Sequence, residues 1–135
     1  MEALLIEGTT TNPEVNFSPD EYTLEIGGYS RPENVHNFYV PLIAWLKDYK
    51  SWLKNQLETT QGIELVTFEF KYIYFNSSSA KFMSDIILLL SDMQKSNIPL
   101  KVYWFFDGDD DELREAGEEF SEMANIPFHF VEISR

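Results

Sequence analysis

The 135-residue sequence contains no cysteine, and this absence excludes several kinds of chemistry at once. Disulfide bonds, thiolate catalysis and zinc sites built on sulfur all require that residue. Long apolar runs are also missing, because the Ile86–Leu90 run is far shorter than the roughly 20 residues that span a bilayer. The first residues, Met1–Gly8, lack the basic start of a signal peptide. We therefore expect a cytoplasmic protein without membrane insertion.

Basic residues are scarce: 10 Lys and Arg stand against 23 Asp and Glu, for a formal net charge of -13. The segment from Asp107 to Glu122 contributes nine of the acids and one base, Arg114. Such a field repels nucleic-acid phosphates and anionic lipid head groups, and it attracts basic partners. The composition therefore argues against nucleic-acid binding, and we expect the free protein to be a monomer.

Apolar residues make up 44% of the chain and aromatic residues 16%, which is enough material for one buried core. Alternating apolar positions predict strands at Leu4–Glu7, Glu14–Phe17, Tyr22–Gly27, Ile63–Phe75, Leu100–Phe106 and Phe128–Ile133. In the fourth of these, alternation places Val66, Phe68, Phe70, Tyr72 and Tyr74 on one side.

Apolar spacings of three and four predict three helices: one after the start signals of Ser30–Asn34, one beyond Asn76 and one beyond Asp111. The pattern indicates a single domain over residues 1–135, of the α/β (α+β) class, with a mixed sheet of about five to six strands packed against three helices.

The junction Asn76-Ser-Ser-Ser-Ala-Lys81 lies where a strand pattern stops and a helix pattern begins. The first N–H groups of a helix lack intrahelical acceptors and the helix dipole is positive there, so a phosphate is stabilised at such a position. Lys81 lies one helical turn beyond Ser77 and could pair with it. The alternative is that Asn76 or Ser77 only caps the helix.

An acidic turn at Asp107-Gly-Asp-Asp-Asp111 follows the next strand along the chain. The two strands are joined by a helix and should run parallel, so their carboxyl ends should lie side by side. We therefore expect Asp107, Asp109, Asp110 and Asp111 near the serines and assign them to partner binding. A calcium loop would need glycine where Glu112 stands; we expect no metal and no cofactor.

A serine nucleophile is the main alternative from another functional class. Ser77 could act with His36 or His129 as base, but the chain has no G-x-S-x-G elbow and the histidines lie on separate elements. We therefore expect no catalytic residue and no enzymatic activity.

Several segments, in their order and spacing, resemble the SiaC-type regulatory phosphoproteins, a bacterial family whose fold is similar to the STAS domains of anti-sigma-factor antagonists. These segments are Gly8-Thr with Pro13, Tyr29-Ser-Arg-Pro-Glu-Asn34 leading into Phe38-Tyr39 and Trp45-Leu46, Tyr74-Phe-Asn-Ser-Ser-Ser-Ala-Lys81, Tyr103-Trp104 and Ile126-Pro-Phe128.

The resemblance implies a STAS-like domain that acts by partner switching. In that family the phosphorylated residue is the threonine of an Asn-Thr-Ser-Ser motif, and Ser77 occupies its position here. Ser78 and Ser79 are alternative acceptors, and Asn76 and Lys81 would support the phosphosite.

The resemblance further implies a cognate serine/threonine kinase, a PP2C-like phosphatase and a diguanylate cyclase that the unphosphorylated form binds and activates. Cyclic di-GMP signalling and biofilm formation would then be the output. An anti-sigma-factor-antagonist-like protein acting on another effector is the alternative within this class.

Overall fold

The computed structural model describes residues 1–59 and 62–135, which form one α/β domain with a six-stranded mixed sheet and three helices. In chain order the elements are β1 (Leu4–Ile6), β2 (Glu14–Ser18), the 3₁₀ turn η1 (Pro19–Glu21), β3 (Thr23–Ser30), α1 (Val35–Thr59), β4 (Val66–Phe75), α2 (Ser77–Lys95), β5 (Leu100–Asp107), α3 (Asp111–Ala124) and β6 (Phe128–Ile133). The predicted fold class is confirmed.

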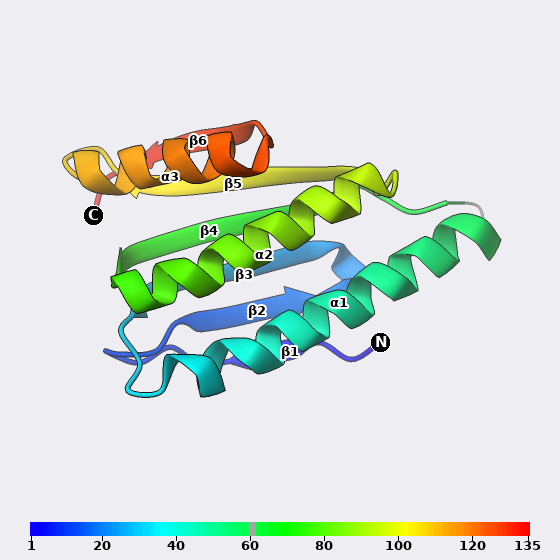
Figure 1. Ribbon diagram of the computed structural model, residues 1–135, viewed down its shortest axis with the longest axis horizontal. Coiled ribbons are helices and arrows are strands. Elements are labelled where there is room, and N and C mark those ends of the chain that lie inside the picture. Colours follow the sequence, from blue (N-terminus) through cyan, green and yellow to red (C-terminus); the bar gives the residue numbers. More distant parts are fainter. Residues whose placement is uncertain (60–61) are drawn as a thin grey trace.

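The strands lie in the sheet in the order of the chain, β1 to β6. β1, β2 and β3 form an antiparallel meander, and β4, β5 and β6 each run parallel to the strand before them. Three successive crossovers that step in the same direction place their helices on one face of the sheet. Figure 1 shows α1, α2 and α3 side by side in front of the strands, all beginning at the left-hand end, where β3 to β6 finish.

The core lies between the sheet and this helix layer. Alternate residues of β4 and β5 are buried against the helices, among them Phe68, Phe70 and Trp104. Each large side chain withdrawn from water contributes about 1.5–3 kcal/mol. Trp104 also donates from Nε1 to the carbonyl of Leu113 at 2.9 Å, which attaches the first turn of α3 to the centre of the sheet.

Alternation fails at the end of β4, where Tyr74 is 47% exposed instead of buried. The register with β3 pairs Tyr72 with Gly28 and Tyr74 with Tyr29, so Ile73 is an extra residue in the ladder. Gly28 has a φ of +88°, which glycine adopts without the penalty that a Cβ would bring. A bulge of this kind turns the following side chain to the other face of the sheet, and the prediction that grouped Tyr74 with the core was wrong.

The first helix begins directly after the Ser30–Asn34 start signals, as predicted, but Ser30 is not its cap. Ser30 is the last residue of β3 and is buried, and α1 starts at Val35. The side chain of Asn34, not Ser30, accepts the backbone N–H of Asn37 at 3.0 Å. Pairing of Ser30 with Phe75 across the sheet outweighs the local tendency of Ser30 to begin a helix near Pro32.

Candidate functional site

The serine junction begins α2 at Ser77, and Asn76 is its cap. The side chain of Asn76 accepts the backbone N–H of Ser79 at 2.9 Å, with φ of −90° and ψ of 173°. This contact satisfies one of the first donors of the helix. Because Asn76 performs the capping, the exposed hydroxyls of Ser77 and Ser78 are not needed for it.

Ser79 has a different environment from its two neighbours, because it is fully buried. Its hydroxyl donates to the carbonyl of Ser30 at 3.1 Å and accepts from the Ser30 hydroxyl at 2.8 Å. Ser30 in turn bonds the hydroxyl of Tyr39 at 2.5 Å, and Tyr39 bonds that of Tyr72 at 3.1 Å. A kinase cannot reach Ser79 without opening the core, so its interpretation as an alternative acceptor does not fit the folded protein.

The tyrosines of this buried network stay protonated. Burial raises the pKa of Tyr39 above its ordinary value, and it raises the pKa of Tyr72 further. The network is therefore a set of neutral hydroxyls whose hydrogen bonds satisfy one another inside the core. It joins the end of β3, the start of α2, and α1, which holds the junction in place.

Two cations lie near the junction. Lys81 is exposed, and its ammonium lies 6.0 Å from the ring centroid of Phe82. Arg31 directly follows Ser30, whose carbonyl accepts the backbone N–H of Asn76 at 3.0 Å. Among the described residues neither Lys81 nor Arg31 forms an ion pair.

The sequence did not single out Arg31, whose place depends on the register of β3 against β4. Its Nε donates to the carbonyl of Thr10 at 3.0 Å, and its guanidinium lies 5.2 Å from the ring centroid of Tyr29 and 5.9 Å from that of Tyr74. These contacts hold the side chain at the same edge of the sheet as the serines. Because Arg31 follows the last residue of β3, its place beside the serines depends on strand pairing, and no local sequence signal identifies it.

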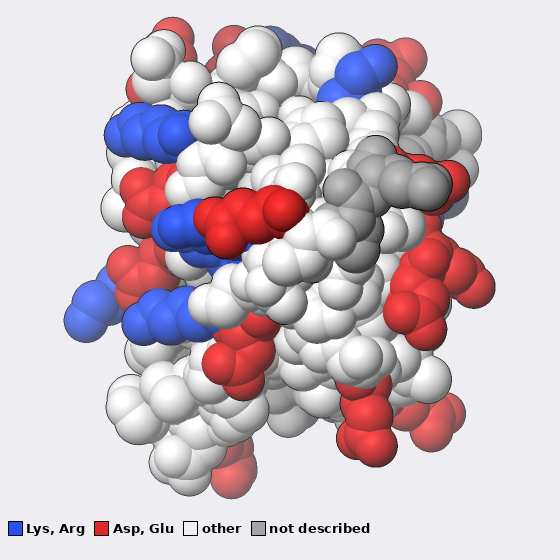
Figure 2. Space-filling model, turned by 90° about the vertical axis from the view of Figure 1, so that its right-hand side faces the viewer, with Lys and Arg blue, Asp and Glu red and all other residues white. Residues whose placement is uncertain are grey.

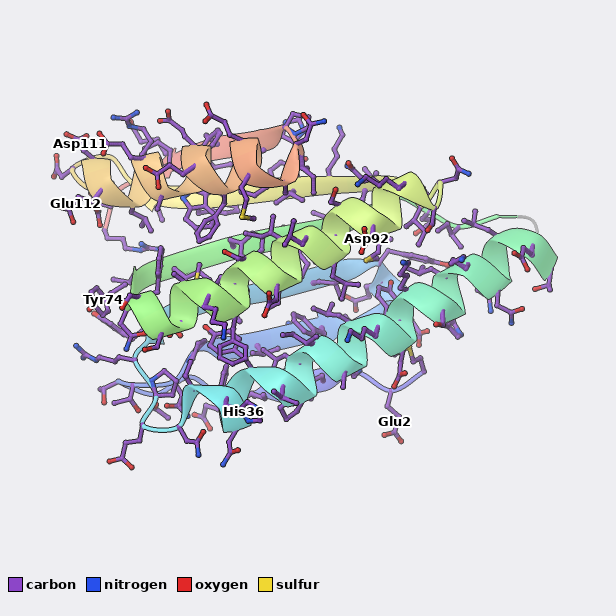
Figure 3. The ribbon with its side chains drawn as sticks, in the orientation of Figure 1. Glu2, His36, Tyr74, Asp92, Asp111 and Glu112 are labelled. Atoms are coloured by element: carbon purple, nitrogen blue, oxygen red, sulfur yellow. The ribbon has the colours of Figure 1, made fainter. Side chains whose placement is uncertain are left out.

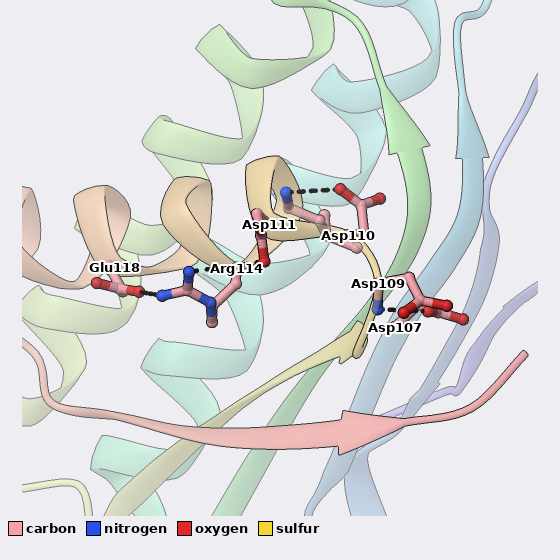
Figure 4. Close-up of polar contacts among 7 residues, drawn as sticks. Asp107, Asp109, Asp110, Asp111, Arg114 and Glu118 are labelled. Atoms are coloured by element: carbon pink, nitrogen blue, oxygen red, sulfur yellow. Dashed lines mark hydrogen bonds and ion pairs between the residues drawn. The ribbon is translucent and has the colours of Figure 1, made fainter.

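The acidic turn Asp107–Asp111 is ordered by its own side chains (Figure 4). Asp107 accepts the backbone N–H groups of Asp109 at 2.8 Å and Arg135 at 2.9 Å, and these bonds lower the pKa of Asp107. Asp110 caps α3 by accepting the N–H of Leu113 at 3.0 Å. Asp107 and Asp110 are therefore committed to the turn, whereas the carboxylates of Asp109 and Asp111 are exposed.

The acidic turn lies beside the end of β4. A hollow of about 230 Å³ is lined by Ile73, Tyr74, Phe75, Asp110, Glu112, Leu113 and Ala116. Figure 3 shows Tyr74, Asp111 and Glu112 at the same end of the molecule. The end of β4, which leads into the serines, therefore borders the acidic turn.

The two histidines lie apart from each other. His36, on α1, packs edge-on against Phe82, with ring centroids 6.2 Å apart. His129, in β6, lies against Tyr103 with ring centroids 5.1 Å apart. Among the described residues neither histidine makes a hydrogen bond to a serine of the junction, so the geometry does not support a Ser77 nucleophile.

In the described ranges 1–59 and 62–135, no three carboxylates and histidines are grouped so that they could hold a metal ion. In the same ranges, no helix combines the length and apolarity needed to cross a membrane.

Comparison with known proteins gives a consistent picture. The model of the SiaC family regulatory phosphoproteins matches residues 6–133. An uncharacterized protein of Pseudomonas aeruginosa (strain UCBPP-PA14) is 28% identical over 128 residues, covering 95% of this chain and 94% of that protein.

Solved structures agree over the whole chain. SiaC of Pseudomonas aeruginosa is 27% identical, with a TM-score of 0.79 and 100% coverage of both chains. A crystal structure of the diguanylate cyclase SiaD with its activator SiaC, from the same organism, contains a chain that is 26% identical, with a TM-score of 0.83. That match covers 96% of this chain and 99% of the other.

Proposed function

Because the chain belongs to the SiaC family of regulatory phosphoproteins, we propose that it is a partner-switching regulator controlled at Ser77. Its unphosphorylated form binds and activates a diguanylate cyclase, and phosphorylation of Ser77 by a cognate serine/threonine kinase releases that partner. A PP2C-like phosphatase restores the active form. The output is cyclic di-GMP signalling in the cytoplasm, with biofilm formation as its consequence.

The observation that carries the proposal is the exposed hydroxyl of Ser77 at the start of α2, next to a cap formed by Asn76. A kinase can reach this hydroxyl in the folded protein, and modifying it breaks no capping bond. The similar P. aeruginosa protein that is solved as the activator of a cyclase supports the identity of the partner.

The protein tolerates a phosphate at this place for physical reasons. The group adds roughly two negative charges, and it meets the positive end of the α2 dipole. Lys81, one turn along the helix, and Arg31, beyond the end of β3, are cations that can pair with it. The fold should therefore survive modification.

Release of the partner follows from desolvation. A partner that covers the start of α2 would have to remove water from the phosphate. The free-energy cost of burying such a charge exceeds the stabilisation that screened ion pairs at the surface provide. The acids of the turn already repel any further negative charge at this edge. A coupling of about 1–3 kcal/mol would change affinity by about 5- to 150-fold, which is sufficient for a switch.

We further propose that the chain is a regulator without turnover of its own. Neither His36 nor His129 is placed to activate Ser77, and the contacts of the serine junction serve helix capping and core hydrogen bonding.

The test is protein that carries phosphoserine only at position 77, produced by genetic encoding of that residue. Binding to the diguanylate cyclase of the same organism is measured by calorimetry, with unmodified protein and Ser77→Ala as controls. We expect the two controls to bind and stimulate the cyclase, and the phosphorylated form to bind about 5- to 150-fold more weakly. Equal affinity of all three forms, with unchanged circular dichroism, would contradict the proposal.

Phosphopeptide mapping of the protein isolated from its own cells tests the choice of serine. Phosphate should be found on Ser77 and absent from Ser79. Modification confined to Ser78 would move the switch by one residue and overturn the assignment.

A further inference from the structure

The sheet divides at its carboxyl edge. β4 and β5 pair from Val66 with Leu100 to Phe70 with Trp104, and their register ends there. β4 continues to Phe75 beside β3, and β5 continues to Asp107 beside β6. The two strands therefore stop pairing before either of them ends.

The bulge at Ile73 places two large apolar side chains at this division. Ile73 is 37% exposed and Tyr74 is 47% exposed, which is unusual for residues of a strand inside the sheet. Ile73 lines three hollows, and two of them adjoin, because they share Ile73 and Asp110: one of about 230 Å³ against the start of α3 and one of about 350 Å³ against the acidic turn. We call this pair of hollows the split groove. Its exposed large apolar residues are Ile73 and Tyr74, its lining also contains Phe75, Leu113 and Ala116, and its acidic rim is Asp107, Asp109, Asp110 and Glu112.

Arg135 shows which chemistry the acidic end of the split groove accepts. Its guanidinium Nη1 donates to the carbonyl of Tyr72 at 3.4 Å, and its backbone N–H donates to Asp107. A guanidinium from this chain thus lies between the separated strands, next to carboxylates. The long distance indicates a weak bond, which an incoming basic side chain could replace.

We propose that the split groove is the docking site for a segment of the cyclase partner that carries a large apolar side chain flanked by lysine or arginine. This inference rests on the proposed function. The apolar side chain would lie against Ile73 and Tyr74, and the basic residues would face Asp109 and Glu112.

Other occupants fit the groove less well. The hollow against the start of α3, of about 230 Å³, has room for a single anchoring side chain. A second copy of this chain would bring the same acids face to face, because a twofold contact pairs a surface with itself. An anionic ligand would meet the same repulsion.

The groove also lies beside the switch. Phe75 and Asn76 alone separate Tyr74 from Ser77 in the chain, so a segment seated on Tyr74 would extend over the start of α2. A phosphate on Ser77 would then be covered by the same contact, which links docking and release at one edge of the sheet.

The test measures binding of the full-length, unphosphorylated protein to the cyclase. The variants are Ile73→Ala and Tyr74→Ala, and the matched control is Leu88→Ala, an equally exposed apolar residue on α2. Because buried apolar anchors dominate such contacts, we expect each groove variant to weaken binding about tenfold or more and the control to bind like the wild type. Melting temperatures near that of the wild type would show that the variants are folded.

The outcomes separate the two proposals. If the wild type binds the cyclase and both groove variants bind equally well, the docking site is wrong and the proposed function stands. If the wild type does not bind, the proposed function is wrong and the docking inference fails with it. For Arg135→Ala we expect binding as tight as that of the wild type or tighter; weaker binding would contradict the idea that a partner side chain replaces this guanidinium.

Discussion

At the scale of single residues, Ser77 and Ser79 show how two positions in one run of serines acquire different roles. A helix advances by about 100° per residue, so Ser79 lies on the same face as Met83 and Ile86, which point to the core. Ser77 lies on the outer face. The hydroxyl of Ser79 therefore serves the buried network, and the hydroxyl of Ser77 stays accessible to an enzyme.

Ser79→Ala tests the structural role. The substitution removes a hydroxyl that donates to the carbonyl of Ser30 and accepts from its hydroxyl, while that carbonyl keeps the N–H of Asn76 and that hydroxyl keeps Tyr39 as partners. We expect a loss of about 0.5–1.5 kcal/mol in the free energy of unfolding, measured in urea. Ser78→Ala, at an exposed neighbouring position, should change it by no more than about 0.5 kcal/mol. Similar losses for the two variants would show that the buried network does not stabilise the fold.

At the scale of elements, the ends of the strands and the starts of the helices determine which residues surround the serines. The sequence predicts some of these boundaries better than others. The start of α2 could be predicted, because Asn76 caps it and a period of two, kept from Val66 to Tyr72, precedes it. The cap of α1 could not, because Ser30 belongs to β3 through its pairing with Phe75, a contact distant in sequence, and Asn34 accepts the first N–H instead. Non-local pairing of this kind overrides local propensity.

The same limit applies to the candidate site. The proximity of the serine junction to the acidic turn follows from parallel strands, which the pattern of alternating strands and helices implies. The exposure of Tyr74 does not follow from that pattern, because it depends on the bulge at Ile73 opposite Gly28. The position of Arg31 needs the register of β3 against β4, which no periodicity in the sequence carries.

Gly117 controls the distance between α3 and the sheet. A Cβ at this position would lie 2.5 Å from Cδ1 of Trp104, far inside van der Waals contact. Trp104 is buried and its Nε1 is bonded to Leu113, so the ring cannot move aside freely. The close approach of this helix face positions the acidic turn beside the end of β4.

For Gly117→Ala we therefore expect net destabilisation. Overpacking costs about 1–3 kcal/mol, and the better helix propensity of alanine returns at most about 1 kcal/mol. Urea unfolding followed by tryptophan fluorescence measures the difference. The comparison is Glu119→Ala, an exposed position on the same helix. A stabilised Gly117→Ala variant would show that α3 can move away from Trp104 at little cost.

At the scale of the whole molecule, charge is distributed unevenly around the fold. Lys47, Lys50 and Lys54 lie in the second half of α1, and Lys95 ends α2. Figure 2 looks at the end where these helices finish, and it shows basic side chains gathered on the helical side of that end, among acidic ones. The acidic turn lies at the other end of the helices, before the start of α3, so its carboxylates border the proposed docking edge.

Association with a basic partner segment should therefore depend on ionic strength. Screening shortens the reach of the field to about 10 Å at 0.1 M salt and about 3 Å at 1 M. We expect the association rate constant with the cyclase, measured by stopped flow, to fall about tenfold or more between roughly 0.05 M and 0.5 M salt, while dissociation changes less.

Neutralising Asp109 and Glu112 together, as Asp109→Asn with Glu112→Gln, should flatten that salt dependence, because both carboxylates are exposed on the acidic rim of the split groove. The pair Glu2→Gln with Glu7→Gln removes the same two charges at exposed positions in the N-terminal segment and is the matched control. If the field acts locally, only the first pair reduces the association rate at low salt. Equal reductions in both variants would mean that net charge alone steers the partner, and a rate that rises with salt would mean that the partner surface is acidic.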